Sequence, residues 1–118
     1  MAFRFEHLAI WKLANEYADM IHRLVMKFPK REMYGLASDL NRASISISSN
    51  IAEGSGSDSG VEFKRFLGIA AKSLFESISQ IFIARRRQYI TDDEFGIVYE
   101  HGVLLAKKIK CLQKKLVC

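Results

Sequence analysis

Two clusters of cationic side chains are the residues of this chain best suited to bind a ligand. Three consecutive arginines precede a group of five lysines near the end of the sequence, and the eight candidate contacts are Arg85, Arg86, Arg87, Lys107, Lys108, Lys110, Lys114 and Lys115. Guanidinium and ammonium groups bind phosphate oxygens, which RNA and DNA present in series. Cations also complement the helix dipole at helix C-termini. The pattern therefore indicates either contact with nucleic acid or stabilisation of helix ends.

Other reactive side chains form no catalytic or metal-binding pattern. Asp19 and His22 make a single carboxylate-x-x-His pair, whereas a di-iron bundle needs two Glu-x-x-His pairs and further glutamates. No serine lies in a Gly-x-Ser-x-Gly turn, and the loop of residues 54–60 lacks the Lys-Ser/Thr ending of a phosphate-binding loop. We expect no enzymatic activity, no catalytic residue, no metal ligand and no cofactor.

The segment of residues 36–54 alternates Ser and Ile over part of its length, yet its overall spacing is that of a helix. Its apolar residues recur at steps of four, three, four and four: Leu36, Leu40, Ala43, Ile47 and Ile51. Polar residues beside them, with a glutamate of the next helix, form a set that we assign to structure: Arg42, Ser46, Asn50, Glu53, Gly54 and Glu76. Polar groups inside a bundle need partners, so this set is expected to specify packing.

Partners can be predicted for three of these residues. A guanidinium inside a bundle needs a carboxylate, so we expect Arg42 to pair with Glu76 or with Asp19. Removing one partner of a buried pair typically costs about 3–5 kcal/mol, and Arg42→Ala should then lower the melting temperature. Asn50 and Glu53 are expected to tie their helix to the loop that follows.

Four amphipathic segments predict an all-α protein: residues 6–27, 33–53, 60–88 and 92–116. Pro29 should end the first segment, and Gly54 should end the second in a left-handed conformation. Two capping boxes should begin the last two segments: Ser59 with Glu62, and Thr91 with Glu94. Short connections make neighbouring helices antiparallel. We expect one domain, residues 1–118, folded as an antiparallel up-down-up-down four-helix bundle.

Composition and cysteine content are typical of a small reduced protein. The chain has 118 residues, 49% of them hydrophobic, and a formal charge of +5. Cys111 and Cys118 would lie about 10 Å apart along one helix, too far for a mutual disulfide. We expect no signal peptide, no apolar stretch of the roughly 18–20 residues that span a bilayer and no membrane contact, so the predicted location is the cytoplasm.

Apolar residues outside the main stripes indicate self-association. They occur on the second and third segments: Ala37, Ile45, Ala52, Phe66, Ile69, Phe75 and Ile83. An apolar surface wider than one helix face needs a second partner, so a homo-oligomer is expected. In a ring of subunits, each basic cluster would be repeated into a continuous basic rim.

Over about residues 5–90 the chain resembles the bacterial four-helix-bundle proteins encoded in intervening sequences of 23S ribosomal RNA genes. The motifs that carry the resemblance are Leu8-x-x-Trp11, Phe28-Pro29-x-x-Glu32-x-Tyr34-Gly35-Leu36, Arg42-Ala43-x-x-Ser46-Ile47-x-x-Asn50-Ile51-Ala52-Glu53-Gly54, Glu62-Phe63-x-x-Phe66-Leu67-x-Ile69-Ala70 and Ser73-x-x-Glu76. Two departures stand out. Asn41-Arg42 replaces a usual Arg-Arg pair, and Lys72 precedes Ser73 where the family usually has Gly.

The resemblance implies an all-helical bundle that assembles into homopentamers and has no established enzymatic activity. A more distant similarity, to the accessory proteins of diversity-generating retroelements, implies a basic pentamer that binds a reverse transcriptase and nucleic acid. Two functions therefore remain open. One is an oligomeric bundle that binds RNA, DNA or a ribonucleoprotein through basic helix ends. The other is a scaffold that docks a partner enzyme without nucleic-acid contact.

Overall fold

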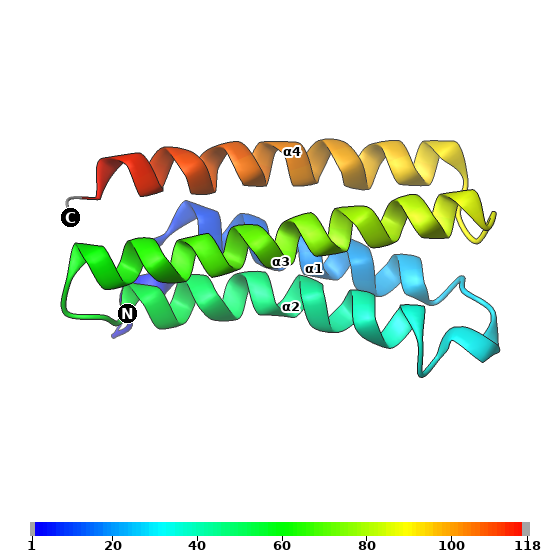
Figure 1. Cartoon of the computed structure of the whole chain (residues 1–118), viewed down its shortest axis with the longest axis horizontal. Helices are drawn as coiled ribbons and strands as arrows, with labels where there is room; N and C mark the ends of the chain where they lie inside the picture. Colours follow the sequence, from blue (N-terminus) through cyan, green and yellow to red (C-terminus); the bar gives the residue numbers. More distant parts are fainter. Residues whose placement is uncertain (1, 117–118) are drawn as a thin grey trace.

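The computed structural model describes residues 2–116, which form four long helices and two short 3-10 helices. In chain order these are η1 (Arg4–His7), α1 (Ala9–Val25), η2 (Lys30–Glu32), α2 (Leu36–Ser55), α3 (Gly60–Arg86) and α4 (Asp92–Lys115). Consecutive long helices run in opposite directions along a body of 43 × 22 × 22 Å, and the start of η1 lies at the same end of it as the end of α4 (Figure 1). The all-α, four-helix prediction is confirmed.

Helix pairs differ in how closely they pack. The most extensive contact joins α2 to α3, and the least extensive joins α1 to α4. All four helices contribute to one core, whose largest fully buried side chains are Tyr17, Ile21, Leu40, Ile47, Ile51, Phe63, Leu67, Leu74, Ile81, Leu105 and Ile109. The seam between α1 and α4 is therefore the most open side of the bundle.

Helix α3 is more apolar than the sequence analysis expected. Within residues 2–116 it alone combines the length of a membrane span with a window of mean hydropathy 1.3. Phe63, Leu67, Ala70, Leu74 and Ile81 of this helix are buried in the core of the bundle. The expectation that no such stretch exists was wrong. Only 28% of the window is buried in the bundle, and exposed Phe75 and Ile83 belong to the same helix.

The capping residues explain where the last two helices begin. Thr91 Oγ1 accepts from the Glu94 N–H at 3.1 Å, and Glu94 Oε1 accepts from the Thr91 N–H at 2.8 Å, which confirms this capping box. Ser59 Oγ accepts from the Glu62 N–H at 3.2 Å, but the Glu62 carboxylate turns to Arg65 instead of closing the box.

The C-terminus of α3 lies two residues earlier than predicted. Gln88 adopts a left-handed conformation with φ 62°. The N–H of Gln88 donates to the Arg85 carbonyl and that of Tyr89 to the Ala84 carbonyl, each at 2.9 Å. These two bonds form a Schellman motif, which ends the helix and turns the chain toward α4.

Gly54 was predicted to end α2, but it lies inside the helix. The helix continues to Ser55, and no glycine among the described residues has a positive φ. A Cβ on Gly54 would lie 2.6 Å from Phe66 Cβ and 2.9 Å from Phe63 Cδ1. Glycine is needed here because α2 and α3 approach each other closely, not because the backbone is left-handed.

The predicted ion pair of Arg42 is also wrong. Its side chain is 74% exposed and pairs through Nη2 with Asp39 Oδ1, 2.5 Å away and one turn earlier. Glu76 and Asp19, the predicted partners, are exposed. Arg42 lies on the outer side of α2, where its ion-pair partner is Asp39 of the same helix. Because exposed ion pairs contribute little to the free energy of unfolding, Arg42→Ala should change stability little.

The other polar residues of α2 bind one another and α3. Asn50 Nδ2 donates to the Ser46 carbonyl at 2.8 Å, and Ser46 Oγ lies 2.9 Å from Ser73 Oγ on α3. Glu53 is exposed and makes no side-chain hydrogen bond or ion pair within residues 2–116. The predicted ties of Asn50 and Glu53 to the loop are thus wrong, whereas Ser46 contacts Ser73 of α3 and Gly54 lies against Phe63 and Phe66 of the same helix.

The apolar residues expected outside the core do reach the surface. Ile45, Phe75 and Ile83 are 56%, 61% and 37% exposed. The remaining members of the group are half-buried: Ala37, Ala52, Phe66 and Ile69. Cys111 is an exposed free thiol, whereas Cys118 lies outside the described residues.

Candidate nucleic-acid interface

The three arginines at the end of α3 point in different directions. Arg85 packs on aromatic rings: its Cζ lies 4.0 Å from the ring centre of Phe95 and 5.2 Å from that of Phe82. These two rings meet edge to face at 4.7 Å, so Arg85 covers the junction between α3 and α4. This arginine is half-buried, and its guanidinium is already engaged within the chain.

Arg87 is engaged by η2, on another side of the bundle. Its Nη1 lies 3.3 Å from Glu32 Oε2. Arg86 is exposed and, within residues 2–116, has no ion-pair or hydrogen-bond partner. The arginine triplet therefore offers one unengaged guanidinium rather than a patch of three.

Glu32 holds together the end of the bundle where Arg87 lies. Its Oε2 accepts from Tyr89 Oη at 2.7 Å, and its Oε1 accepts from the Leu36 N–H at 3.3 Å. These bonds, first of all the one from Tyr89, lower the pKa of the carboxyl group from its ordinary 4.5. In the sequence, Glu32 stands in the motif Phe28-Pro29-x-x-Glu32, and no role was predicted for it. The only feature of the sequence that could have indicated this role is the position of Glu32, an acidic residue that follows Phe28-Pro29 and precedes the start of α2.

The lysines of α4 divide between two faces, because consecutive helical residues are turned by about 100°. Lys107 and Lys110 border a groove shared with α3, while Lys108 and Lys115 border one shared with α1. Lys114 is exposed and borders neither groove. The predicted cluster of five is thus two pairs and one separate lysine.

The groove between α3 and α4 gathers three ammonium groups around an apolar floor. Lys72 of α3 joins Lys107 and Lys110 of α4 at its edge, and the groove encloses about 320 Å³. The remaining lining residues are neutral: Gly68, Ala71, Phe75, Ala106 and Gln113. Like charges brought together without a carboxylate create a positive potential that attracts phosphate.

Lys72 is the residue of this groove that the sequence analysis missed as a ligand-binding candidate. It was noted as a departure from a motif, because the family usually has a small residue there. The spacing of the sequence could have indicated its place in the groove. Gly68, Lys72 and Phe75 are separated by four and three residues and so share one side of α3.

The arrangement can bind an anion but offers no reaction chemistry. Three mobile ammonium groups over small apolar side chains make contacts to phosphate oxygens that depend on charge, not on base sequence. Within residues 2–116, no group of three or more His, Cys, Asp or Glu side chains could hold a metal ion.

Comparison with known proteins finds one family match. The model of the family described as 23S rRNA-intervening sequence protein matches residues 6–114, which is nearly the whole chain and includes all four long helices except the last residue of α4. A comparison with curated proteins finds no match.

Proposed function

The chain belongs to the 23S rRNA-intervening sequence protein family, and on that premise we propose that it is a non-enzymatic bundle that binds RNA or DNA through the groove between α3 and α4. The observation that carries the proposal is the convergence of Lys72, Lys107 and Lys110 on a groove with no acidic lining residue. Phosphate neutralisation supplies most non-specific affinity for nucleic acid. Arg86 and Lys114 are secondary contacts in this proposal.

Self-association is the second part of the proposal. Ile45 and Ile83 are exposed, and Ala52 and Ile69 are half-buried, all outside the core on α2 and α3, which supports a contact between copies through the outer surfaces of these two helices. The family resemblance favours five copies. Each copy would bring its own lysine groove, on the adjacent α3–α4 side, so that several grooves act on one polyanion and raise its apparent affinity. The cytoplasm is the proposed location, since RNA is the proposed ligand.

Filter binding of the full chain to a structured RNA and to duplex DNA tests the proposal. We expect binding near 50 mM salt and a loss of roughly 10-fold or more near 200 mM, since each neutralised phosphate contributes to the salt dependence. The triple variant K72E/K107E/K110E should lose binding at both salt concentrations.

A matched triple variant controls for net charge. R23E/K108E/K115E changes the formal charge by the same amount on the α1–α4 side, and all three of its residues are exposed. It should retain more affinity than K72E/K107E/K110E. Equal losses in the two variants would show that only net charge matters and would remove the groove from the proposal. Absence of binding near 50 mM salt would remove the nucleic-acid function itself.

A further inference from the structure

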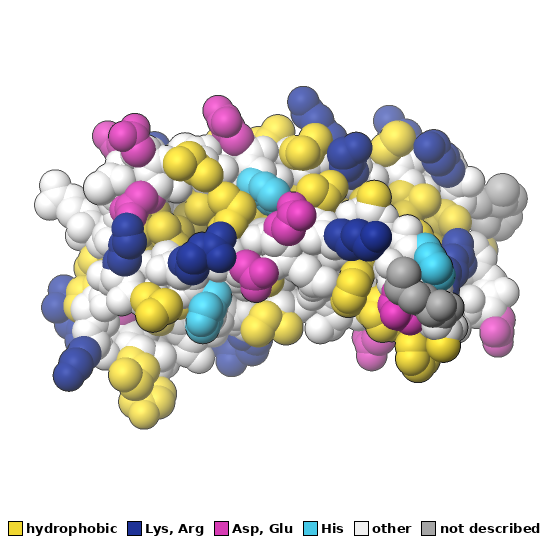
Figure 2. All heavy atoms as spheres, turned by 180° about the vertical axis from the view of Figure 1, so that it is seen from behind, with side chains coloured by type: hydrophobic (Ala, Val, Ile, Leu, Met, Phe, Trp, Pro, Cys, Tyr) yellow, Lys and Arg dark blue, Asp and Glu magenta, His cyan; other side chains and the backbone are white. Residues whose placement is uncertain are grey.

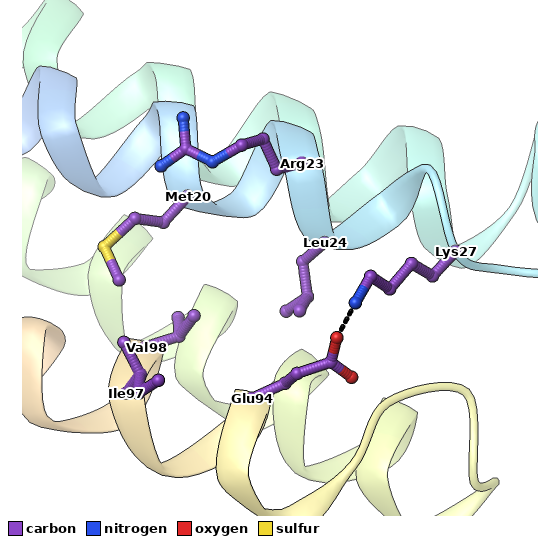
Figure 3. A pocket seen from close by; sticks show the side chains of 7 residues that line it. All are labelled: Met20, Arg23, Leu24, Lys27, Glu94, Ile97 and Val98. Carbon is purple, nitrogen blue, oxygen red and sulfur yellow. Dashed lines mark ion pairs between the residues drawn. The ribbon is translucent and has the colours of Figure 1, made fainter.

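The seam between α1 and α4 contains two grooves that the proposed function does not use. One encloses about 330 Å³ and has a floor of Met20 and Leu24 from α1 and Ile97 and Val98 from α4. Figure 3 shows Met20 and Leu24 pointing toward Ile97 and Val98, with the ion pair of Lys27 and Glu94 closing one end of the groove.

The second groove lies at the other end of the same seam. It encloses about 260 Å³ and is lined by Leu8, Ile10 and Leu112 together with Lys108 and Lys115. Between the two grooves, His101 bridges the helices: its Nε2 lies 3.4 Å from the Leu13 carbonyl oxygen. The two grooves therefore belong to one elongated surface along α1 and α4.

Exposed apolar residues follow this surface with the spacing of a helix–helix contact. Ile97, Leu104 and Cys111 are seven residues apart on α4, and the first two are 62% and 44% exposed. Leu13 and Met20 of α1 are also seven residues apart and half-buried, and Met20 lines one groove together with Ile97. A repeat of seven residues presents one continuous stripe to a neighbouring helix.

The charges along the seam define the neighbour that would fit. Arg23, Lys108 and Lys115 are exposed and have no ion-pair or hydrogen-bond partner among the described residues, whereas Glu94 is taken by Lys27. Glu16 lies near the middle, 3.9 Å from His101. The unpaired charge of the groove linings is therefore positive. Figure 2 shows this side of the molecule, where hydrophobic side chains lie among those of lysine, arginine, aspartate and glutamate. Glu16 and Glu100 are exposed on the same two helices but line neither groove.

We propose that the α1–α4 seam binds an acidic amphipathic helix of a partner protein. Apolar side chains of that helix would cover the stripe of Ile97 and Leu104, and its carboxylates would pair with Arg23, Lys108 and Lys115. The 17 residues of α1 extend for about 26 Å, so a helix of about 17 residues would fill the seam. Nucleic acid fits less well, because the exposed apolar side chains of the stripe cannot donate hydrogen bonds to phosphate oxygens. A second copy of this chain, with its charge of +5, brings a surplus of the same sign.

The test measures fluorescence anisotropy of a labelled synthetic peptide on the full-length protein. The peptide has about 18 residues, with Leu at heptad spacing on one face and Glu on the other. We expect saturable binding that weakens at least 10-fold in I97E and in R23E/K108E/K115E. Both variants alter only exposed residues, and circular dichroism checks their folding. I45E, on α2, which lines neither groove of the seam, is the matched control for I97E and should bind as the wild type does.

Three results would overturn the inference. The first is no binding of the peptide, and the second is equal binding of a scrambled peptide in which the leucine stripe is broken. The third is a change in oligomer mass caused by I97E, which would assign the seam to contact between copies. RNA binding is measured on the same variants, so that failure of this inference is distinguished from failure of the nucleic-acid function. K72E/K107E/K110E should lose RNA and retain the peptide.

Discussion

At the scale of single residues, neighbouring arginines of one sequence run have different tasks. Consecutive positions on a helix diverge by about 100°, so a run of three cannot form one patch. Arg85 rests on two aromatic rings, Arg87 pairs with Glu32, and Arg86 has no partner within residues 2–116. The sequence run identified a basic helix end but not these separate roles, because each role depends on a residue of another element.

Alanine substitutions should separate the three arginines by stability. Arg85→Ala should lower the free energy of unfolding by about 0.5–1 kcal/mol through loss of its cation–π contact. Arg87→Ala should lower it by about 0.2–1 kcal/mol, since its ion pair is half-exposed. Arg86→Ala should leave it unchanged within experimental error. Urea denaturation of the three variants provides the measurement, and a loss confined to Arg86→Ala would contradict the assignment.

Glu32 makes the stability of the bundle depend on pH. Its pKa is lowered in the folded state, chiefly by the hydrogen bond from Tyr89, so the folded protein favours the ionised carboxylate more than the unfolded chain does. The corresponding stability is fully present above the unfolded pKa, whose ordinary value is 4.5, and is lost as the pH falls through the lower folded pKa.

Melting temperatures of the wild type and Glu32→Gln at pH 7 and below pH 4.5 check this dependence. The variant should be less stable at pH 7 and should lose less stability on acidification than the wild type. Tyr89→Phe serves as the control, since it removes the bond that contributes most to the lowered pKa. An identical acid dependence of Glu32→Gln and wild type would contradict a structural role for the ionised carboxylate.

At the scale of helices, the sequence predicted the capped starts of α3 and α4 to the residue, whereas α1 and α2 begin three residues later than predicted. The capping box of Thr91 and Glu94 is local, so four consecutive residues were sufficient to place the start of α4. Gly54 was misinterpreted, because glycine ends a helix in some sequences and admits a neighbouring helix in others, and only the position of Phe66 distinguishes the two. The partner of Arg42 was missed because the rotation of α2 about its axis depends on packing.

Two glycine substitutions test the close contact of α2 and α3. Alanine is the better helix former by about 0.5–1 kcal/mol, but at Gly54 its Cβ would lie 2.6 Å from Phe66 Cβ. Overpacking of this kind costs about 1–3 kcal/mol, so Gly54→Ala should be destabilising overall. Gly96 of α4 has nothing within 4 Å of an added Cβ, and Gly96→Ala should therefore be stabilising. Thermal denaturation gives the melting temperature of each variant. A higher melting temperature for Gly54→Ala than for Gly96→Ala would contradict the packing role of Gly54.

At the scale of the whole molecule, the outer surfaces of the bundle differ in chemistry. Helices α2 and α3 expose Ile45 and Ile83, the α3–α4 side gathers lysines, and the α1–α4 side combines an apolar stripe with unpaired cations. The order of these sides follows from the antiparallel topology, which the sequence predicted. Their composition does not follow from it, since lysines such as Lys107 and Lys108 are adjacent in sequence but border different grooves.

Size-exclusion chromatography with light scattering tests the proposed self-association. The measured mass should be a multiple of the 13.5 kDa chain, five-fold by family resemblance. Ile45→Glu places a charge on the exposed apolar surface of α2 and should reduce the mass, whereas Ile97→Glu on α4 should leave it unchanged. A wild-type mass of one chain at micromolar concentration would contradict the oligomer.

The salt dependence of RNA binding tests the lysine groove most directly. The slope of log K against log salt counts the phosphates that the protein neutralises, at about 0.7 per phosphate for a single strand and about 0.9 for a duplex. With a single-stranded RNA, a variant carrying Lys→Gln at 72, 107 and 110 should bind more weakly and with a slope shallower by about 2 for each groove engaged. A variant that keeps the wild-type slope would contradict phosphate contact by these lysines.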